Sequence, residues 1–513
     1  MLTVRHLTLI HKKDLVPLIE DLSFTLGPGE RIALIGEEGN GKSTLLRAAA
    51  GDRSILGYVQ MSGQILLRGR AGYLPQELPA ADREKTAYAY FSEEPRFLDS
   101  TPRELGELAA RMRLSADVFY SDQRMDAFSG GERVKLQLAR VMLTAPELLL
   151  LDEPSNDLDM ETLRWLESFL CGCGLSVLFI SHDETLLRRT ATGVLLLERL
   201  HRRQTTRAGL SRQGYDAFVR GRADLFAHQM QVARKEREEY DKKMRRYEQI
   251  RSSVEREQNA VSRRDPGTAR LLKKKMHTVL SMGRRFEREA AQMTDVPEQE
   301  EAVFARLSCE PLPPSKVVLD LALPELRAGG RTLCRDVRLT VRGREKLCIT
   351  GRNGVGKSTL LRAAARALQE RSDLRVFTMP QDPCELLCMD KTPIEQLTRT
   401  GDKEENVRIC VALGSMKFTA EEMRRPCRAL SGGQRAKLMF LCMAQSGANV
   451  LLLDEPTRNL SPLSGPVLRA LLCEYPGCIV AVSHDALFIR EVCTHSAVLT
   501  PDGLQPRVST ELD

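Results

Sequence analysis

The sequence predicts an α/β protein in which two similar domains of alternating strands and helices are joined by an antiparallel helical hairpin. Two observations predict the paired domains. A set of glycine-rich, acidic and histidine motifs occurs twice, and apolar runs lead into the motifs in both copies, as buried strands do. A third observation predicts the hairpin, because a charged segment between the copies repeats apolar residues at helical spacing. The predicted domains are residues 1–210, 211–296 and 297–513.

The segment from about Asp216 to Met293 predicts two helices with a turn between them. Its apolar residues recur on alternating steps of four and three, first at Phe226, Met230, Ala233, Tyr240, Met244, Tyr247 and Val254, and then at Leu272, Met276, Val279, Phe286, Ala290 and Met293. This spacing places one apolar seam on each helix, which is typical of a coiled coil. Arg263-Arg264-Asp265-Pro266-Gly267 is a turn signal that ends the first helix. The alternative is a solvated, charged linker, but such a linker needs no sustained seam.

The positive charge of the chain lies in this central segment. Residues 201–295 contain 24 Lys and Arg against 13 Asp and Glu, a net charge of +11. The rest of the chain carries 52 basic and 56 acidic residues, a net charge of −4. A basic rod between two mildly acidic domains favours a polyanionic partner, most simply nucleic acid. A membrane surface fits less well, because the apolar seams are used against each other.

No run of 18 apolar residues is present, so no membrane-spanning segment is expected. The first residues alternate like a strand and do not resemble a signal peptide. Thirteen scattered cysteines, an odd number without framework spacing, favour a reducing cytoplasm. Two close cysteine pairs, Cys171 with Cys173 and Cys384 with Cys388, lack the further ligands of a zinc site and favour buried thiols.

In the first copy, an apolar strand at residues 31–35 leads into a phosphate-binding loop. The loop is followed by an apolar helix, and strand, GxxxxGKS and helix in that order cradle phosphate with backbone N–H groups. Lys42 would neutralise the outer phosphates and Ser43 would bind Mg²⁺. The predicted binding residues are Gly36, Gly39, Asn40, Gly41, Lys42, Ser43 and Thr44.

Four further motifs follow in the first copy. Gln76 ends a short strand, and Ser129-Gly130-Gly131 opens an amphipathic helix whose start suits an anion. A buried leucine strand then ends at Asp152 and Glu153. Asp152 suits Mg²⁺, and Glu153 suits orienting or deprotonating a water molecule. His182 follows another apolar strand, where we interpret it as a sensor of the terminal phosphate; an isolated histidine would more often be structural.

The second copy repeats the pattern. Its predicted loop residues are Gly351, Asn353, Gly354, Gly356, Lys357, Ser358 and Thr359, and they are followed by Gln381, Ser431-Gly432-Gly433, Asp454, Glu455 and His484. Three motifs lie 302 residues after their counterparts: Ser431 after Ser129, Asp454 after Asp152 and His484 after His182. The loops are 315 residues apart, so the first copy has 13 more residues between its loop and its SGG turn. This pattern indicates a tandem duplication with helical subdomains of different size.

The order of these motifs resembles the ATP-binding cassette superfamily. The resemblance implies two P-loop cassettes that share ATP and Mg²⁺, each site combining the phosphate loop of one cassette with the SGG signature of the other. It also implies catalytic roles for Glu153, Glu455, His182, His484, Gln76 and Gln381. The implied Mg²⁺ ligands are Ser43, Gln76, Asp152, Ser358, Gln381 and Asp454. Because the two cassettes pair within one chain, no obligate homodimer is expected.

Two cassettes without a membrane segment, joined by a charged helical hairpin, are similar to the ABC-F family. That resemblance implies binding to the ribosome at the exit site for tRNA, with the hairpin extended toward the peptidyl-transferase centre. On this basis the expected contacts to rRNA and tRNA are Arg263, Arg264, Lys273, Lys274 and Lys275. Some members of the family are general translation factors, and others remove antibiotics from the ribosome.

Two features resemble the antibiotic-resistance branch. Only 52 residues separate Gln76 from Ser129, which is too few for the extra helical arm of some general factors. In addition, Ser461 stands where the first copy has Asp159. A general translation factor remains the alternative within the family, and an ATPase subunit of a transporter or a DNA-repair complex remains the alternative outside it. The adenine-stacking aromatic of the superfamily has only His11 as a candidate, so the choice between ATP and GTP stays open.

Overall fold

The computed structural model describes residues 1–13, 15–156, 158–200, 205–260, 266–291, 307, 309–458 and 460–507. The chain divides into two compact units. One unit contains residues 1–215 and 300–513, and the other contains residues 216–299. The first unit carries both motif sets, and the second is the charged helical segment. The predicted boundaries between the cassettes and the hairpin stay predictions.

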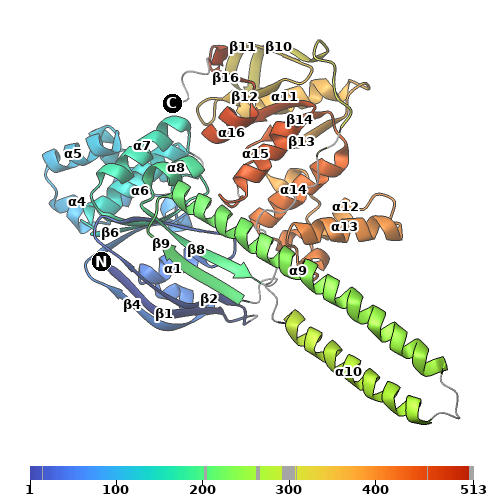
Figure 1. Ribbon diagram of the computed structural model, residues 1–513. Coiled ribbons are helices and arrows are strands. Elements are labelled where there is room, and N and C mark those ends of the chain that lie inside the picture. The colour runs from blue at the N-terminus through green and yellow to red at the C-terminus, as the bar shows by residue number, and fades with distance from the viewer. Residues whose placement is uncertain are drawn as a thin grey trace. The chain divides into compact units, whose positions relative to one another are not determined.

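The first cassette is built on a six-stranded sheet of order β5-β6-β7-β3-β8-β9 (Figure 1). Its strands are parallel except for β9, which pairs antiparallel with β8. The strands are β3 (Arg31–Gly36), β5 (Ala71–Leu74), β6 (Leu148–Asp152), β7 (Ser176–Ile180), β8 (Gly193–Leu200) and β9 (Thr205–Ser211). A second sheet has the order β2-β1-β4 and contains β1 (Leu2–His11), β2 (Pro17–Leu26) and β4 (Val59–Leu67). Every residue of β6 and β7 is buried, as expected for a sheet covered on both faces.

The second cassette repeats this topology with the order β13-β14-β15-β12-β16-β17. The strands are β12 (Lys346–Thr350), β13 (Val376–Met379), β14 (Val450–Asp454), β15 (Cys478–Val482), β16 (His495–Thr500) and β17 (Gly503–Arg507). A two-stranded sheet of β10 (Val317–Ala328) and β11 (Arg331–Arg342) accompanies it. The matching strand orders confirm the predicted pair of α/β cassettes.

Both cassettes place their motifs between these strands and a common set of helices. In the first cassette these are α1 (Lys42–Ala49), α6 (Gly130–Leu143), α7 (Met160–Gly172) and α8 (Glu184–Thr190). Their counterparts in the second cassette are α11 (Lys357–Gln369), α14 (Gly432–Ser446), α15 (Gly465–Glu474) and α16 (Ala486–Val492).

The cassettes differ in the helical subdomain that precedes the signature helix. The first has α2 (Ala80–Arg83), α3 (Ala87–Ser92), α4 (Pro95–Asp99) and α5 (Pro102–Met112), whereas the second has α12 (Pro393–Leu397) and α13 (Lys403–Ser415). Ten of the 13 additional residues of the first copy precede Gln76, in the interval that contains β4, and only three lie in the helical subdomain.

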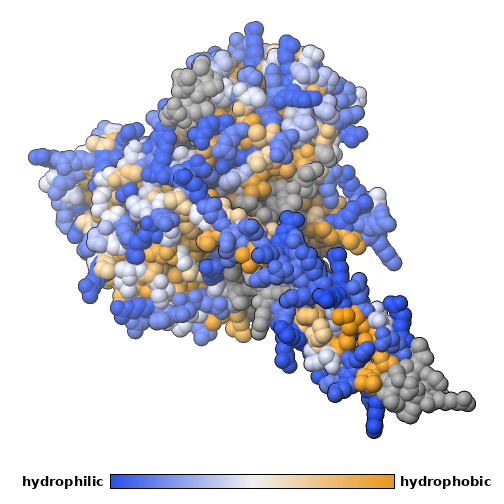
Figure 2. Space-filling view, viewed as in Figure 1, coloured by the Kyte–Doolittle hydropathy of each residue, from blue (hydrophilic) through white to orange (hydrophobic). Residues whose placement is uncertain are grey.

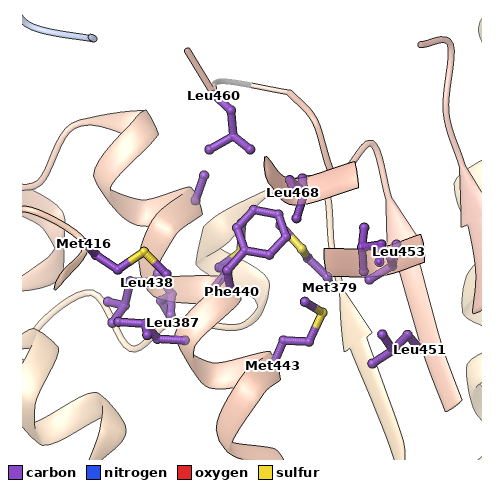
Figure 3. Close-up of a cluster of buried hydrophobic side chains, with 14 of the residues drawn as sticks. Met379, Leu387, Met416, Leu438, Phe440, Met443, Leu451, Leu453, Leu460 and Leu468 are labelled. Atoms are coloured by element: carbon purple, nitrogen blue, oxygen red, sulfur yellow. The ribbon is translucent and has the colours of Figure 1, made fainter. Parts of the chain in front are cut away.

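The core of the second cassette holds the signature helix and a neighbouring loop in place. Phe440, from α14, is buried among Met379, Met443 and leucines of β14 (Figure 3). Leu460, in the loop that follows β14, is 3% exposed and belongs to the same cluster. The loop is thus held by its side chain, which leaves its backbone groups available to the other cassette.

The second unit is a helical hairpin of α9 (Tyr215–Ala260) and α10 (Pro266–Ala291), which confirms the antiparallel pair and excludes the linker alternative (Figure 1). Figure 2 shows hydrophilic residues over its outer surface and hydrophobic residues where its helices meet. The buried centre of this contact is Tyr247, Val254 and Val279, with Met244, Met276 and Phe286 packed against it. A Cβ added to Gly283 would lie 2.6 Å from the Tyr247 hydroxyl oxygen, so the glycine permits this close approach.

The predicted seams are longer than the buried contact. Met230 is 38% exposed and Ala290 is exposed, so their assignment to the seam was wrong. Apolar spacing marks a helix face, but it does not determine how far the facing helix covers each residue on that face. Met293 and the turn residues Arg263, Arg264 and Asp265 lie outside the described residues. Within the described part of the chain, no helix is both long and apolar enough to cross a membrane.

Candidate nucleotide-binding sites

Each phosphate loop lies between a buried strand and the start of a helix. The residues before the lysines, Gly41 and Gly356, have φ angles of 83° and 105°. Side chains rarely adopt this left-handed region, so glycine is needed where the loop turns into the helix. The Lys42 ammonium donates to the carbonyl oxygens of Gly36 (2.8 Å) and Glu37 (3.0 Å). Lys357 donates in the same way to Gly351 (2.8 Å) and Arg352 (3.0 Å).

Burial lowers the pKa of both lysines, although neighbouring carboxylates oppose the shift. An added anion in the loop would therefore find a desolvated cation beside the backbone N–H groups that begin α1 or α11. Of the other predicted loop residues, Asn40 donates its Nδ2 to the carbonyl oxygen of Leu197 at 3.0 Å. That hydrogen bond ties the first loop to strand β8.

The strands β6 and β14 end at the carboxylates predicted to bind Mg²⁺. The Ser43 hydroxyl donates to Asp152 Oδ1 at 3.0 Å, and burial raises the pKa of Asp152 to about 6. Burial also raises the pKa of Asp454, whose Oδ1 is buried without a hydrogen-bond partner among the described residues. A buried carboxylate oxygen without a donor, beside a serine hydroxyl, fits Mg²⁺. With the serine and aspartate of each site, and the predicted Gln76 or Gln381, the remaining ligands would be water and phosphate oxygens.

The glutamates that follow these carboxylates have an unusual backbone. Glu153 and Glu455 both have a φ angle of 50°, which is uncommon for residues other than glycine. Strain of this kind persists where function requires a side-chain direction, and here it occurs at both equivalent positions. His182 Nε2 lies 3.1 Å from Glu153 Oε1, whereas His484 Nε2 lies 3.8 Å from Glu455 Oε1.

The pKa values of Glu455 and His484 both differ from those of the free amino acids. Burial raises the pKa of Glu455 to about 8 and lowers the pKa of His484 to about 4, the latter with a further contribution from Lys357. Both shifts favour the neutral forms while the site is empty, so Glu455 has to lose its proton before it can accept one from water.

Residues of both cassettes meet around a cavity of about 520 Å³, a size suited to a small-molecule ligand. We call this arrangement site 2. The second cassette contributes Asn353, Gly354, Gly356, Lys357, Ser358, Thr359, Gln381, Asp454, Glu455 and His484. The first cassette contributes Gly130 of its signature, Arg133 one turn further along α6, and residues that follow β6 and β7, among them His182. The structure thus brings together the phosphate loop, acidic pair and histidine of one cassette with the signature helix of the other.

Site 1 is the reciprocal combination of Lys42, Ser43, Asp152, Glu153 and His182 with Ser431-Gly432-Gly433. Where the loop residues Glu37 and Glu38 meet the signature helix, a cavity of only about 20 Å³ is lined by Glu37, Glu38, Ser431, Gly433, Gln434, Lys437, Leu460 and Ser461. A carboxylate oxygen of Glu38 accepts a hydrogen bond from the backbone N–H of Gly433. Gln76 is exposed and lines neither of these two cavities, unlike its counterpart Gln381.

Further contacts join the cassettes between the two sites. His182 Nδ1 lies 2.6 Å from the carbonyl oxygen of Leu460. Arg469, which is 2% exposed, makes two hydrogen bonds to Glu184, at 2.6 and 3.2 Å. Asp183, beside Glu184, has its pKa raised to about 7 by burial and by the charge of Asp485.

Several residues that line the two sites do not belong to the sequence motifs. Leu333, which precedes Cys334 in β11, lines site 2 where no aromatic residue was found. Glu37, Glu38 and Lys437 join the sides of site 1. The two glutamates could have been recognised by aligning the two loops, because Glu37-Glu38 stands where the second loop has Arg352-Asn353.

The predicted RNA contacts fall on the hairpin. Lys273, Lys274 and Lys275 are exposed on α10, and Lys275 lies 3.7 Å from Glu257 of α9. Arg263 and Arg264 are outside the described residues.

Comparison with known proteins supports the motif assignment. A family profile described as "ABC transporter" matches residues 19–156 and 334–458, one segment in each cassette. The chain is 28% identical to the energy-dependent translational throttle protein EttA of Escherichia coli, over 93% of this chain and 88% of that protein. It is 29% identical to the tylosin resistance ATP-binding protein TlrC of Streptomyces fradiae, over 91% of this chain and 92% of that protein.

Solved structures share the fold. The archaeal ribosome recycling factor aABCE1, in its complex with the ribosomal stalk protein aP1, has a TM-score of 0.58 and 16% identity, and the match covers 98% of this chain and 90% of that chain. A structure described as RNase-L inhibitor has a TM-score of 0.56 and the same identity, over 99% and 91% of the two chains.

Proposed function

This chain belongs to the ATP-binding cassette family and to its ABC-F group, and from that premise we propose that it is an ATPase that binds the ribosome and acts on translation. The catalytic part of this proposal rests on one observation. Lys357, Ser358, Asp454, Glu455 and His484 meet the opposite signature helix around a cavity of about 520 Å³. Such a cavity suits a nucleoside triphosphate held between two cassettes.

The residues of site 2 have separate roles in this proposal. Lys357 and the N–H groups at the start of α11 bind the phosphates, while Gly130 and Arg133 face them from the other cassette. When bound through Ser358 and Asp454, Mg²⁺ supplies positive charge to the phosphate oxygens. Glu455 orients and deprotonates the attacking water, and His484 holds the terminal phosphate. Positioning and charge stabilisation together are the usual basis of phosphoryl transfer.

The translation part of the proposal is supported by the relatives and by the hairpin. One relative is described as a translational throttle and another as a tylosin resistance protein. The hairpin segment carries the net charge of +11 and exposes three consecutive lysines on α10. A basic helical rod of this kind suits the phosphate backbone of rRNA or tRNA.

Within this proposal, we favour protection of the ribosome against antibiotics that act at the peptidyl-transferase centre. The short segment between Gln76 and Ser129 and the serine at position 461 support this branch. A general translation factor is the second candidate, which the similarity to EttA supports. A cytoplasmic location follows from either candidate.

The proposed function is tested with the variant that combines Glu153→Gln and Glu455→Gln. This variant should bind MgATP without turnover and should co-sediment with ribosomes only when ATP is present. The lysine variant Lys357→Ala is the control that should lose the ATP-dependent component. Co-sedimentation that is absent with ATP, or equal with and without it, would contradict the ribosomal proposal.

The role of the hairpin is tested by salt. If Arg263, Arg264 and Lys273–Lys275 contact phosphates, ribosome binding should weaken with salt by a slope of about −0.7 to −0.9 per contact. Replacing all five residues with alanine should reduce the slope and leave basal ATPase activity intact. An unchanged slope would mean that these residues form only a solvated face.

The antibiotic role is tested by replacing residues 258–268 with a short Gly-Ser turn. Cassette folding and ATPase activity should survive, because the buried hairpin contact lies at Tyr247, Val254 and Val279. Growth of a sensitive host on drugs that act at the peptidyl-transferase centre should lose any protection given by the unaltered chain. If the unaltered chain protects against none of these drugs, the general translation factor is the better hypothesis.

A further inference from the structure

The two phosphate loops differ in charge at the residues after their first glycine. The first loop has Glu37 and Glu38, whereas the second has Arg352 and Asn353. The first loop is therefore more negative than the second by three unit charges, two from its carboxylates and one from the missing guanidinium. This difference lies beside the place where the sites receive phosphate.

In site 1, both glutamates reach across to the second cassette. A carboxylate oxygen of Glu38 accepts a hydrogen bond from the Gly433 N–H, in the first turn of α14. Glu37 Oε1 lies 3.1 Å from Lys437 Nζ, and their side chains are only 19% and 12% exposed. Two carboxylates thus occupy the start of the signature helix together with the nearest lysine on the same helix.

The start of α14 has few other donors to offer an anion. The Ser431 N–H donates to Gln434 Oε1, and the Ser431 hydroxyl accepts from the Gln434 N–H, so these groups cap the helix. The glycine N–H groups are the ones that face outward. In a composite site they are the groups that a terminal phosphate would use, and in site 1 Glu38 takes one of them.

Site 2 shows the opposite arrangement with the same motifs. Asn353 Oδ1 accepts from the Lys357 ammonium at 3.3 Å, within its own loop. Arg352 extends to Glu161 at 3.4 Å on the exposed rim. The signature residue Gly130 lines the cavity of about 520 Å³, whereas Gly433 lines a cavity of about 20 Å³.

We propose that Glu37 and Glu38 act as a built-in competitor for the terminal phosphate at site 1, so that this site selects against nucleoside triphosphates while site 2 accepts them. The inference rests on the proposed function, because it takes both sites to bind nucleotide. Entry of a triphosphate at site 1 requires the Glu38 carboxylate to leave Gly433 and the Glu37 carboxylate to leave Lys437. It also brings phosphate charge toward two like charges, which is unfavourable in a closed site. A nucleoside diphosphate lacks the phosphate with which Glu38 competes.

The test measures each site alone by isothermal titration of the full chain. Lys357→Ala isolates site 1, and Lys42→Ala isolates site 2. In the first background, Glu38→Asn installs the residue of the other loop and should tighten MgATP binding by about tenfold or more, since it removes a like charge next to the phosphate. In the second background, Asn353→Glu should weaken MgATP binding by a similar factor. Binding of MgADP should change far less in both cases.

Two controls separate this effect from general changes in the protein. Glu38→Gln keeps the size of the side chain and should tighten MgATP binding in the same direction, which covers the case in which Glu38→Asn does not fold. Glu77→Asn removes an exposed glutamate that pairs with Arg83 and should leave the MgATP dissociation constant unchanged.

The outcomes distinguish this inference from the proposed function. MgATP binding to site 2 with no gain at site 1 in either Glu38 variant would overturn the competitor and leave the ATPase proposal standing. An equal gain for MgADP and MgATP would also overturn it, because the glutamate would then not be reading the terminal phosphate. Absence of MgATP binding at site 2 would overturn both.

Discussion

Site 1 and site 2 contain the same motifs in the same topology, yet they differ in how the phosphate loop meets the opposite signature helix. Site 2 adjoins a cavity of about 520 Å³, whereas in site 1 Glu37 and Glu38 contact the second cassette and line a cavity of only about 20 Å³. The motif glycines, lysines and carboxylates occupy equivalent places in both. The difference arises at two loop positions that the motif leaves variable. Equivalent motifs in a duplicated chain therefore do not make equivalent sites.

The largest expected effect is on ATP turnover, and it should differ between the two glutamates that act on water. Glu455→Gln should lower ATP turnover by about 10²–10⁴-fold, the usual contribution of a general base. Glu153→Gln should cause a smaller fall, because the loop of site 1 contacts the second cassette through Glu37 and Glu38. Steady-state ATPase rates of the two single variants, with MgATP binding as the control for folding, make the comparison. An equal loss in both variants would mean that the sites hydrolyse ATP equally.

The next effect concerns a contact that occurs on one side of the interface only. Arg469 pairs with Glu184 across the cassettes, whereas the residue equivalent to Glu184 in the second cassette is Ala486. Arg469→Met leaves the buried Glu184 carboxylate with only Arg188, at 3.5 Å, and should lower the free energy of unfolding by up to about 3–5 kcal/mol. Urea unfolding measures this change.

Two further variants calibrate that result. Glu491→Gln removes the more exposed partner of Arg469, at 41% side-chain exposure, and should cost about 1 kcal/mol or less. Adding Glu184→Gln to Arg469→Met should recover part of the loss, because the double change leaves no unpaired charge. A double variant as unstable as the single one would mean that packing, not charge, holds the interface.

A smaller effect depends on pH and acts on the side of site 2. Asp183 and Asp485 both line its cavity, and burial together with the charge of Asp485 raises the pKa of Asp183 from 3.8 to about 7. Folding therefore takes up a proton between these values. The stability contributed by Asp183 is fully present below pH 3.8, falls as pH rises toward 7 and is lost above it.

Asp183→Asn should remove this dependence and still cap α8, since the amide oxygen can accept from the Leu186 N–H as Asp183 does now. Relative to the unaltered chain, the variant should gain stability between pH 5 and pH 7. Urea unfolding at several pH values measures the difference. Asp485→Asn should weaken the dependence by lowering the pKa of Asp183. A difference that stays constant with pH would contradict the assignment.

The smallest effect concerns Asp159, which follows the first acidic pair and has Ser461 as its counterpart in the second cassette. The Asp159 carboxylate raises the pKa of His484, against the larger effect of burial, which brings it to about 4. Asp159→Asn keeps the hydrogen bond from the Thr162 N–H at the start of α7 and should lower the His484 pKa slightly further. Histidine NMR signals followed against pH measure the shift. A rise instead of a fall would mean that Asp159 does not act on site 2 through its charge.

Much of this architecture follows from local pattern. The strand, loop and helix order around Lys42 and Lys357 determines the backbone there, because glycine and buried apolar residues leave few alternatives. The hairpin could be predicted from the spacing of its apolar residues, although that spacing wrongly placed Met230 and Ala290 in the buried seam. These features depend on residues close together in the chain.

The contacts between cassettes could not be predicted in the same way. Glu38 and Gly433 are 395 residues apart, and their contact depends on how two complete folds dock. The side chains of Gln76 and Gln381 are both exposed, and the place of Gln76 in site 1 stays a prediction. Leu333 carries no motif because an apolar residue that lines a cavity looks like any other core residue.

The contact of Gly283 with Tyr247 limits how α9 and α10 can be aligned along each other. A side chain at position 283 would displace the Tyr247 ring, so a slide of one helix past the other by one turn, about 5.4 Å, would lose this fit. The contact therefore favours one alignment of α9 against α10. A longer or shorter hairpin would need matched insertions or deletions in both helices, made on the tip side of Gly283. Its reach is thus set in discrete steps of a helical turn.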